Sequence, residues 1–245
     1  MSKFSAYKYC MKKTFKKLFY IILTPLLLIA LMLPLAACNA CTPSIDRLGH
    51  LVSEFRENIF LGQSESFSVT IISGKREDPF LMDGIASATR DFTLITITPK
   101  GETSTGAHTF NTVINGTQFK GEFVPHPFAS TFSADLNIRA NQREITLTIV
   151  NGNSHEESLV ARSVITDNMI DGIKALEIAE GKLRYSLKIF EQNGNMNAEI
   201  YIRLLENPID NSGGFYWYVA FVGTCGTIFA ALIDSVSMQI IALRN

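Results

Sequence analysis

The chain is poor in the residues that build metal sites. Its 245 residues include only four cysteines and four histidines. The histidines are His50, His108, His126 and His155, and none lies two to four residues from another histidine or from a cysteine. Local zinc-binding spacings are therefore absent. Only a fold that brought His108, His126 and His155 together would create a metal site, so we expect neither a metal nor another cofactor.

Motifs for catalysis and nucleotide binding are missing as well. The sequence contains no Gly-x-Ser-x-Gly elbow, no cysteine close to a histidine and no Gly-x-x-x-x-Gly-Lys loop. The adjacent carboxylates of Glu156 and Glu157 would point to opposite faces of a strand, which does not suit a general acid and base acting as partners. The sequence thus predicts no catalytic residues and a protein that is not an enzyme.

Basic residues are scarce outside the N-terminal segment. The first 37 residues carry six lysines and no acid, whereas the remaining chain has 16 basic and 23 acidic residues, a net charge of −7. An acidic protein is repelled by phosphate backbones and by anionic membranes. Nucleic acid is therefore not an expected partner, and attachment to a membrane would need a lipid rather than charge.

The N-terminal segment has the order of a secretory signal. Lys12, Lys13, Lys16 and Lys17 precede an apolar run from Leu18 to Leu33, which only Thr24 and Pro25 interrupt. The tetrad Leu35-Ala36-Ala37-Cys38 follows. This pattern resembles the lipobox of bacterial lipoproteins.

The resemblance implies a membrane anchor at Cys38. Residues 1–37 would be the signal peptide, recognised through Leu35, Ala36 and Ala37, and the Cys38 sulfur would receive a diacylglycerol before cleavage. The alternatives are an uncleaved signal anchor and an ordinary signal cleaved near Ala37. Cys41 is a weaker acceptor because no large aliphatic residue stands three positions before it. The expected location is the cell membrane, with the protein lipid-anchored and facing outside the cytoplasm.

Residues 38–44 form a short tether. Six residue steps span about 20 Å when fully extended, so the folded body would lie close to the lipid headgroups. The next segment, 45–60, carries apolar residues at helical spacing and predicts an amphipathic helix capped by Ser44 or Asp46. Its apolar positions are Leu48, Leu51, Val52, Phe55 and Ile59. The acidic polar side favours packing into a core over docking on a membrane.

From Ser66 the apolar period changes to the alternation of half-buried strands. Strands are expected at 66–73, 91–98, 108–114, 117–124, 130–138 and 144–150. Asn115-Gly116, Asn151-Gly152 and Asn193-Gly194 are hairpin-turn candidates. Residues 45–152 therefore read as a helix plus an antiparallel, sandwich-like sheet.

The second region, residues 153–245, predicts a helix followed by an antiparallel meander. The helix spans 167–180 and ends at Gly181. Strands 183–189 and 198–204 would form a hairpin around Asn193-Gly194, and further apolar segments follow at 215–223, 227–234 and 239–243. The fold class is α+β and rich in β-structure. No Pro/Gly-rich linker separates the regions, which allows them to pack as one body.

Three segments have competing interpretations. Residues 215–233 carry no charge and could span a membrane, but their aromatic and β-branched residues favour two core strands around Gly223 to Gly226. The charged segment 75–84 is expected to be a solvated loop rather than a calcium site. Cys225 is expected to be an isolated buried thiol, with a Cys41–Cys225 disulfide as the alternative.

The sequence thus predicts a lipid-anchored extracytoplasmic protein whose role is non-catalytic binding. Its partners would be membrane lipid through Cys38 and either an envelope protein or a small ligand. Two other functions stay open: a hydrolase whose site is assembled from sequence-distant residues, and a lipoprotein that captures a solute.

Overall fold

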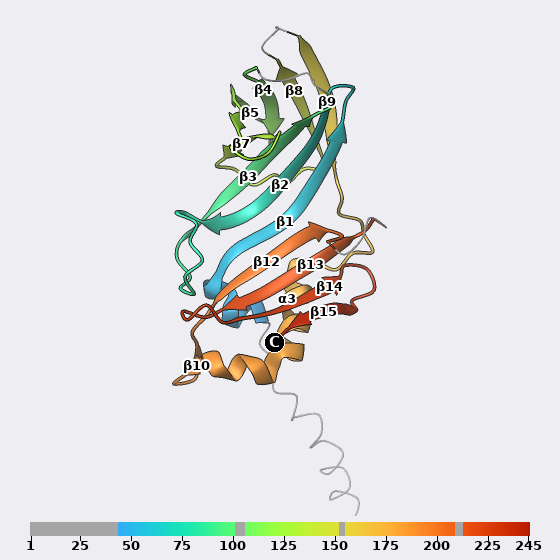
Figure 1. Cartoon of the computed structure of the whole chain (residues 1–245). Coiled ribbons are helices and arrows are strands. Elements are labelled where there is room, and N and C mark those ends of the chain that lie inside the picture. The colour runs from blue at the N-terminus through green and yellow to red at the C-terminus, as the bar shows by residue number, and fades with distance from the viewer. Residues whose placement is uncertain (1–43, 101–105, 152–154, 209–212) are drawn as a thin grey trace, which may run out of the picture. The chain divides into compact units, whose positions relative to one another are not determined.

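Strands dominate the computed structural model, which describes residues 44–100, 106–151, 155–208 and 213–245 (Figure 1). Ser44–Asn245 form one compact unit. The predicted signal peptide and all of the tether except Ser44 lie outside the described residues. No helix in the described part of the chain is both long and apolar enough to cross a membrane.

Thirteen of the described strands form a single antiparallel-rich sheet. They are β1 (Val52–Gln63), β2 (Phe67–Glu77), β3 (Thr89–Pro99), β4 (Thr109–Ile114), β5 (Thr117–Glu122), β6 (Val124–Pro125), β7 (Phe132–Leu136), β8 (Glu144–Val150), β9 (Glu156–Ser163), β12 (Glu199–Glu206), β13 (Phe215–Val222), β14 (Ile228–Asp234) and β15 (Ile240–Arg244). The short β10 (Glu191–Gln192) and β11 (Asn195–Met196) form a separate hairpin. The α-helices are α2 (Ser44–Leu48) and α3 (Gly172–Leu187), and the 3-10 helices are η2 (Gly49–Leu51) and η3 (Lys188–Phe190).

Strand β1 joins the two parts of this sheet. It pairs along most of its length with β2, while its first half pairs in parallel with β12 and its last residues pair with β9. On one side the ladder continues through β13, β14 and β15. On the other side β1 to β9 curl into a nearly closed sheet, which takes the place of the predicted sandwich-like arrangement (Figure 1).

Each part of the sheet encloses its own apolar core. The curled part buries alternate residues of its strands, such as Ile71, Ile95 and Leu147, at 0% exposure. In the β12 to β15 part, α3 packs one face of the sheet, where Leu176 and Leu183 meet Trp217 in the second core. The alternation that predicted half-buried strands follows from these two one-sided interiors.

Helix α3 confirms the predicted second helix but not its bounds. Asp171 caps the helix, because its side chain accepts a 2.7 Å hydrogen bond from the Lys174 amide. The helix then runs through Gly181 to Leu187, so the predicted strand 183–189 and its hairpin are wrong. Leu183 and Leu187 continue the buried stripe of the preceding turns, and this burial outweighs the helix-breaking tendency of one glycine.

The predicted helix 45–60 is also wrong over most of its length. Only Ser44–Leu48 are α-helical, and Val52–Gln63 form β1. Its ladder has irregularities between Val52 and Glu54 and between Arg56 and Asn58. Such bulges insert extra residues and break strict alternation, so apolar residues recur at spacings that imitate a helix.

The remaining strand predictions are confirmed in position. All six strands expected between 66 and 150 occur, and so do the strands at 198–204, 215–223, 227–234 and 239–243. Residues 215–233 thus form two strands. Asn115 and Asn193 have positive φ values in tight turns between strands, as predicted. Gly152 lies outside the described residues. Strand β9 is not among the predicted strands.

The two glycines of α3 give a direct test of the helix packing. A Cβ at Gly172 would press on the Phe55 ring and lie 2.9 Å from Trp217 Cζ3, whereas a Cβ at Gly181 would meet nothing within 4 Å. We expect Gly172→Ala to lower the free energy of unfolding by about 1–3 kcal/mol through overpacking. Gly181→Ala should raise it by about 0.5–1 kcal/mol. Urea denaturation measures both, and equal effects of one sign would contradict this packing.

Candidate functional site

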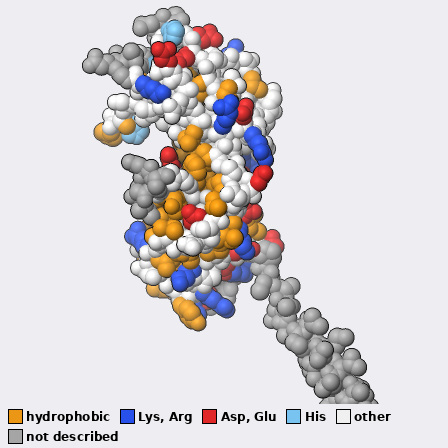
Figure 2. Space-filling model, turned by 90° about the vertical axis from the view of Figure 1, so that its right-hand side faces the viewer, with side chains coloured by type: hydrophobic (Ala, Val, Ile, Leu, Met, Phe, Trp, Pro, Cys, Tyr) orange, Lys and Arg blue, Asp and Glu red, His pale blue; other side chains and the backbone are white. Residues whose placement is uncertain are grey.

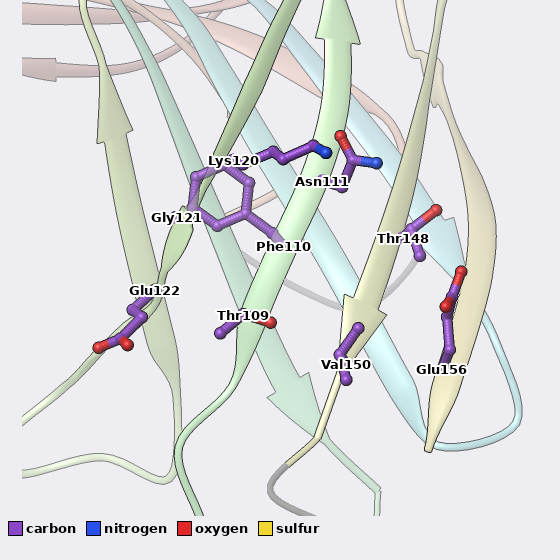
Figure 3. A pocket seen from close by; sticks show the side chains of 9 residues that line it. All are labelled: Thr109, Phe110, Asn111, Lys120, Gly121, Glu122, Thr148, Val150 and Glu156. Carbon is purple, nitrogen blue, oxygen red and sulfur yellow. The ribbon is translucent and has the colours of Figure 1, made fainter. Parts of the chain in front are cut away.

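A shallow groove lined by both polar and apolar groups lies on the outer surface of four neighbouring strands (Figure 3). Its volume is about 470 Å³, within the range of small-ligand sites. The strands are β5, β4, β8 and β9 in that spatial order. The lining residues are Thr109, Phe110, Asn111, Lys120, Gly121, Glu122, Thr148, Val150 and Glu156.

Strand register arranges the groove side chains in two rows. In the first row, Glu122 pairs with Thr109 of the next strand, and Thr109 pairs with Val150. Val150 in turn pairs with Glu156. This row therefore has a carboxylate at each end. Three interstrand spacings separate the backbones of the two glutamates, or about 14 Å.

The second row lies two residues further along each strand. It runs from Lys120 through Asn111 to Thr148 and Ser158. Figure 3 shows the Lys120 and Asn111 side chains beside each other. The Thr148 and Ser158 hydroxyls are 2.8 Å apart, and Gln118 Nε2 donates to Asn111 Oδ1 at 2.9 Å. The row thus offers amine, amide and hydroxyl groups on one surface.

The charged groups of the groove remain available to a ligand. Within the described part of the chain, Lys120, Glu122 and Glu156 make no ion pair, and all three side chains are exposed. Glu157 points the other way and accepts a hydrogen bond from the Ser66 amide. The prediction that Glu156 and Glu157 face opposite sides is confirmed by their alternating register.

A second concentration of polar side chains lies between β1 and β12, where it is buried. Glu54 is 2% exposed and accepts hydrogen bonds from Arg56 and Arg203. Glu199 is fully buried and accepts from Ser53 Oγ at 3.2 Å and from the Gly84 amide at 3.1 Å. Since protein groups satisfy both carboxylates, they act in the structure rather than as a ligand site.

Glu199, Tyr201 and Glu77 hold the β2–β3 connection onto the sheet through hydrogen bonds. Burial first, and then the carboxylates of Glu199 and Glu77, raise the pKa of Tyr201 above its ordinary value. The Tyr201 hydroxyl stays protonated and donates to the Leu81 carbonyl at 3.3 Å. Glu77 accepts from the Ser87 amide. The predicted solvated loop is therefore wrong for 75–77, which are part of β2, and Glu77 is 2% exposed.

The histidines do not share a site. Among the described residues, no group of three or more His, Cys, Asp or Glu side chains could hold a metal ion. His108 is fully buried, with its ring edge-on to Phe67 and Phe132 at centroid distances of 5.4 and 4.6 Å. His126 and His155 are exposed, and neither lines the groove.

Of the two cysteines in these predictions, the structure describes Cys225 and not Cys41. Cys225 is a free thiol, but it is exposed in the β13–β14 turn, so the expected buried thiol is wrong. Its partner in the alternative disulfide, Cys41, lies outside the described residues. The predicted lipidation residue Cys38 and the recognition residues Leu35, Ala36 and Ala37 lie there as well.

Sequence reasoning did not find the groove. Its residues come from segments up to 47 positions apart, Thr109 to Glu156, and its polar members look like ordinary exposed strand positions. The one available signal was the polar alternation of 109–111, 120–122 and 146–148. No protein-family model matches this chain, and no significantly similar curated protein or solved structure was found.

The buried histidine predicts a pH-dependent stability. Burial lowers the pKa of His108 below its ordinary value of 6.5, so the unfolded chain binds a proton there before the folded chain does. Stability from this residue is present above pH 6.5 and falls as the pH drops below it. The free-energy gap between wild type and His108→Gln should therefore narrow from about pH 7.5 to about pH 5 in urea denaturation. A constant gap would contradict the prediction.

Proposed function

We propose that this chain is a lipid-anchored extracytoplasmic binding protein that presents the groove on β5, β4, β8 and β9 to an envelope component. The anchor is supported by Leu35-Ala36-Ala37-Cys38, which follow a basic and then an apolar segment. Two acyl chains on one residue give stable membrane attachment, whereas one chain gives marginal attachment. The net charge of −7 after residue 37 supplies no alternative means of attachment.

The position of the groove relative to the start of the folded body supports this function. Ser44, six residues after Cys38, hydrogen bonds through Oγ to Glu180 Oε2 of α3 at 2.6 Å. Helix α3 lies at one end of the described body, and β4, β5 and β8 lie at the opposite end (Figure 1). An anchor at Cys38 would thus hold the α3 end near the membrane and leave the groove accessible from outside.

The chemistry of the groove favours binding over catalysis. Its available charges have both signs, and hydroxyl and amide groups stand between them. Figure 3 shows the Glu122 and Glu156 side chains at opposite edges of the groove and not turned toward each other, which does not suit a general acid and base acting as a pair. Neither His126 nor His155 lines the groove, so the hydrolase alternative gains no support from it. A partner that carries both positively and negatively charged groups fits these side chains best.

Lipidation at Cys38 can be tested by metabolic labelling. Cells that express the chain and are grown with labelled palmitate should incorporate the label into wild type and not into Cys38→Ala. The Cys38→Ala protein should also leave the membrane fraction. Cys41→Ala is the matched control and should behave as wild type. Membrane retention of Cys38→Ala, with no label in wild type, would contradict the anchor.

The groove can be tested by site-specific photo-cross-linking in intact cells. A photoreactive amino acid at Asn111 should give a reproducible cross-linked species because this position faces the groove. The same amino acid at Val236, an exposed position in the β14–β15 turn, is the control. The cross-link should weaken when Lys120→Ala and Glu122→Ala are combined. Equal cross-linking from Asn111 and Val236 would contradict a groove-specific partner.

A further inference from the structure

The exposed side of the last turn of α3 and of the η3 turn that follows it combines basic and apolar side chains. Lys182, Arg184 and Lys188 are all exposed, and no acidic residue occurs between positions 181 and 190. Tyr185 is 84% exposed and Ile189 is 67% exposed. We call these five residues the α3 surface. It concentrates three of the 16 basic residues that follow residue 37.

The acids of α3 do not neutralise this surface. Glu177 pairs with Lys174 at 2.9 Å, and Glu180 pairs with Arg47 and accepts from Ser44. Within the described residues, by contrast, Lys182, Arg184 and Lys188 form no ion pair. The Lys188 amine lies over the Tyr185 ring, 5.4 Å from its centroid. The α3 surface therefore keeps its positive charge in a chain that is otherwise acidic.

The start of the folded body lies close to this surface. Ser44 is hydrogen bonded to Glu180. Glu180 precedes Tyr185 by five residues, which corresponds to about 8 Å along the helix axis. Cys38 is six residue steps before Ser44, at most about 20 Å away. Basic and hydrophobic side chains lie together at the lower end of the body in Figure 2, the end at which α3 lies in Figure 1.

We propose that the α3 surface contacts an anionic lipid bilayer, with Tyr185 and Ile189 at the headgroup level. This inference rests on the proposed anchor at Cys38, which would bring the surface within reach of the membrane. Tyrosine has an apolar body and a polar tip, which suits the membrane interface. Lysine and arginine beside it bind anionic headgroups within about one Debye length, roughly 10 Å at 0.1 M salt. The contact would set the orientation of the folded body relative to the membrane.

Depth-dependent fluorescence quenching tests this contact. The mature lipidated protein, which begins at Cys38 and carries Cys41→Ser and Cys225→Ser, is labelled with a fluorophore at Tyr185→Cys. It is reconstituted in vesicles of phosphatidylcholine and phosphatidylglycerol. A phospholipid with a spin label near its headgroup is the quencher. Position 185 should be quenched several times more than a fluorophore on Val113→Cys, which is exposed on β4 at the opposite end. Equal quenching at both positions in membrane-bound protein would overturn the proposal.

Charge variants test the role of the basic residues. Combining Lys182→Gln, Arg184→Gln and Lys188→Gln should remove at least half of the quenching at position 185, as should salt at about 1 M, where the Debye length is about 3 Å. The matched control combines Lys75→Gln, Arg143→Gln and Arg162→Gln, three exposed residues outside both the groove and the α3 surface, and should leave quenching unchanged. Equal losses in both triple variants would overturn the proposal.

Flotation of the same vesicles separates this inference from the anchor. If the wild-type protein does not float with the vesicles, or if Cys38→Ala floats equally well, the proposed anchor fails and the α3 contact fails with it. If the wild type floats and Cys38→Ala does not, the anchor holds. An unquenched position 185 in that floating protein then overturns the α3 contact alone.

Discussion

The hydrogen-bonded ladder of β1 is the constraint on which the rest of the structure depends. This single strand pairs with β2, with β12 in parallel and with β9, so its backbone is shared by both parts of the sheet. Buried backbone amides and carbonyls need partners, and β1 supplies them to strands from both predicted regions. Its two faces serve different cores, because Ile59 and Leu61 pack in the core beside α3 and Phe60 packs in the core of the curled part. Loss of this strand would therefore open both cores at once.

Charge is distributed unevenly over the two ends of the body. The buried carboxylates of Glu54 and Glu199 are satisfied by arginines, a hydroxyl and a backbone amide, so they contribute to folding rather than to recognition. The groove at one end carries exposed charges of both signs, and the α3 surface at the other end carries exposed positive charges. With a lipid at Cys38, the end that contains α3 would attach to the membrane, and the end that contains the groove would bind a partner.

The strands were largely predictable from sequence because each part of the sheet has one buried face. Six strands between residues 66 and 150 follow plain alternation, and the Asn115 turn has the left-handed backbone that an Asn-Gly pair favours. The errors have local physical causes. Bulges in β1 imitate helical spacing, and buried Leu183 and Leu187 extend α3 beyond Gly181. Strand β9 is polar on its exposed face, and its apolar residues, such as Leu159 and Ala161, are too few to reveal it.

The sequence by itself determined the lipobox pattern, the acidic balance of the remaining chain, the β-rich class and the positions of most strands, because these depend on residues close together in the chain. Only the tertiary structure decided that Glu122 and Glu156 line one groove and that the acids of α3 are paired while Lys182, Arg184 and Lys188 are not. Those properties depend on which strands become neighbours and on which charges meet across long sequence separations. Local periodicity carries no information about either.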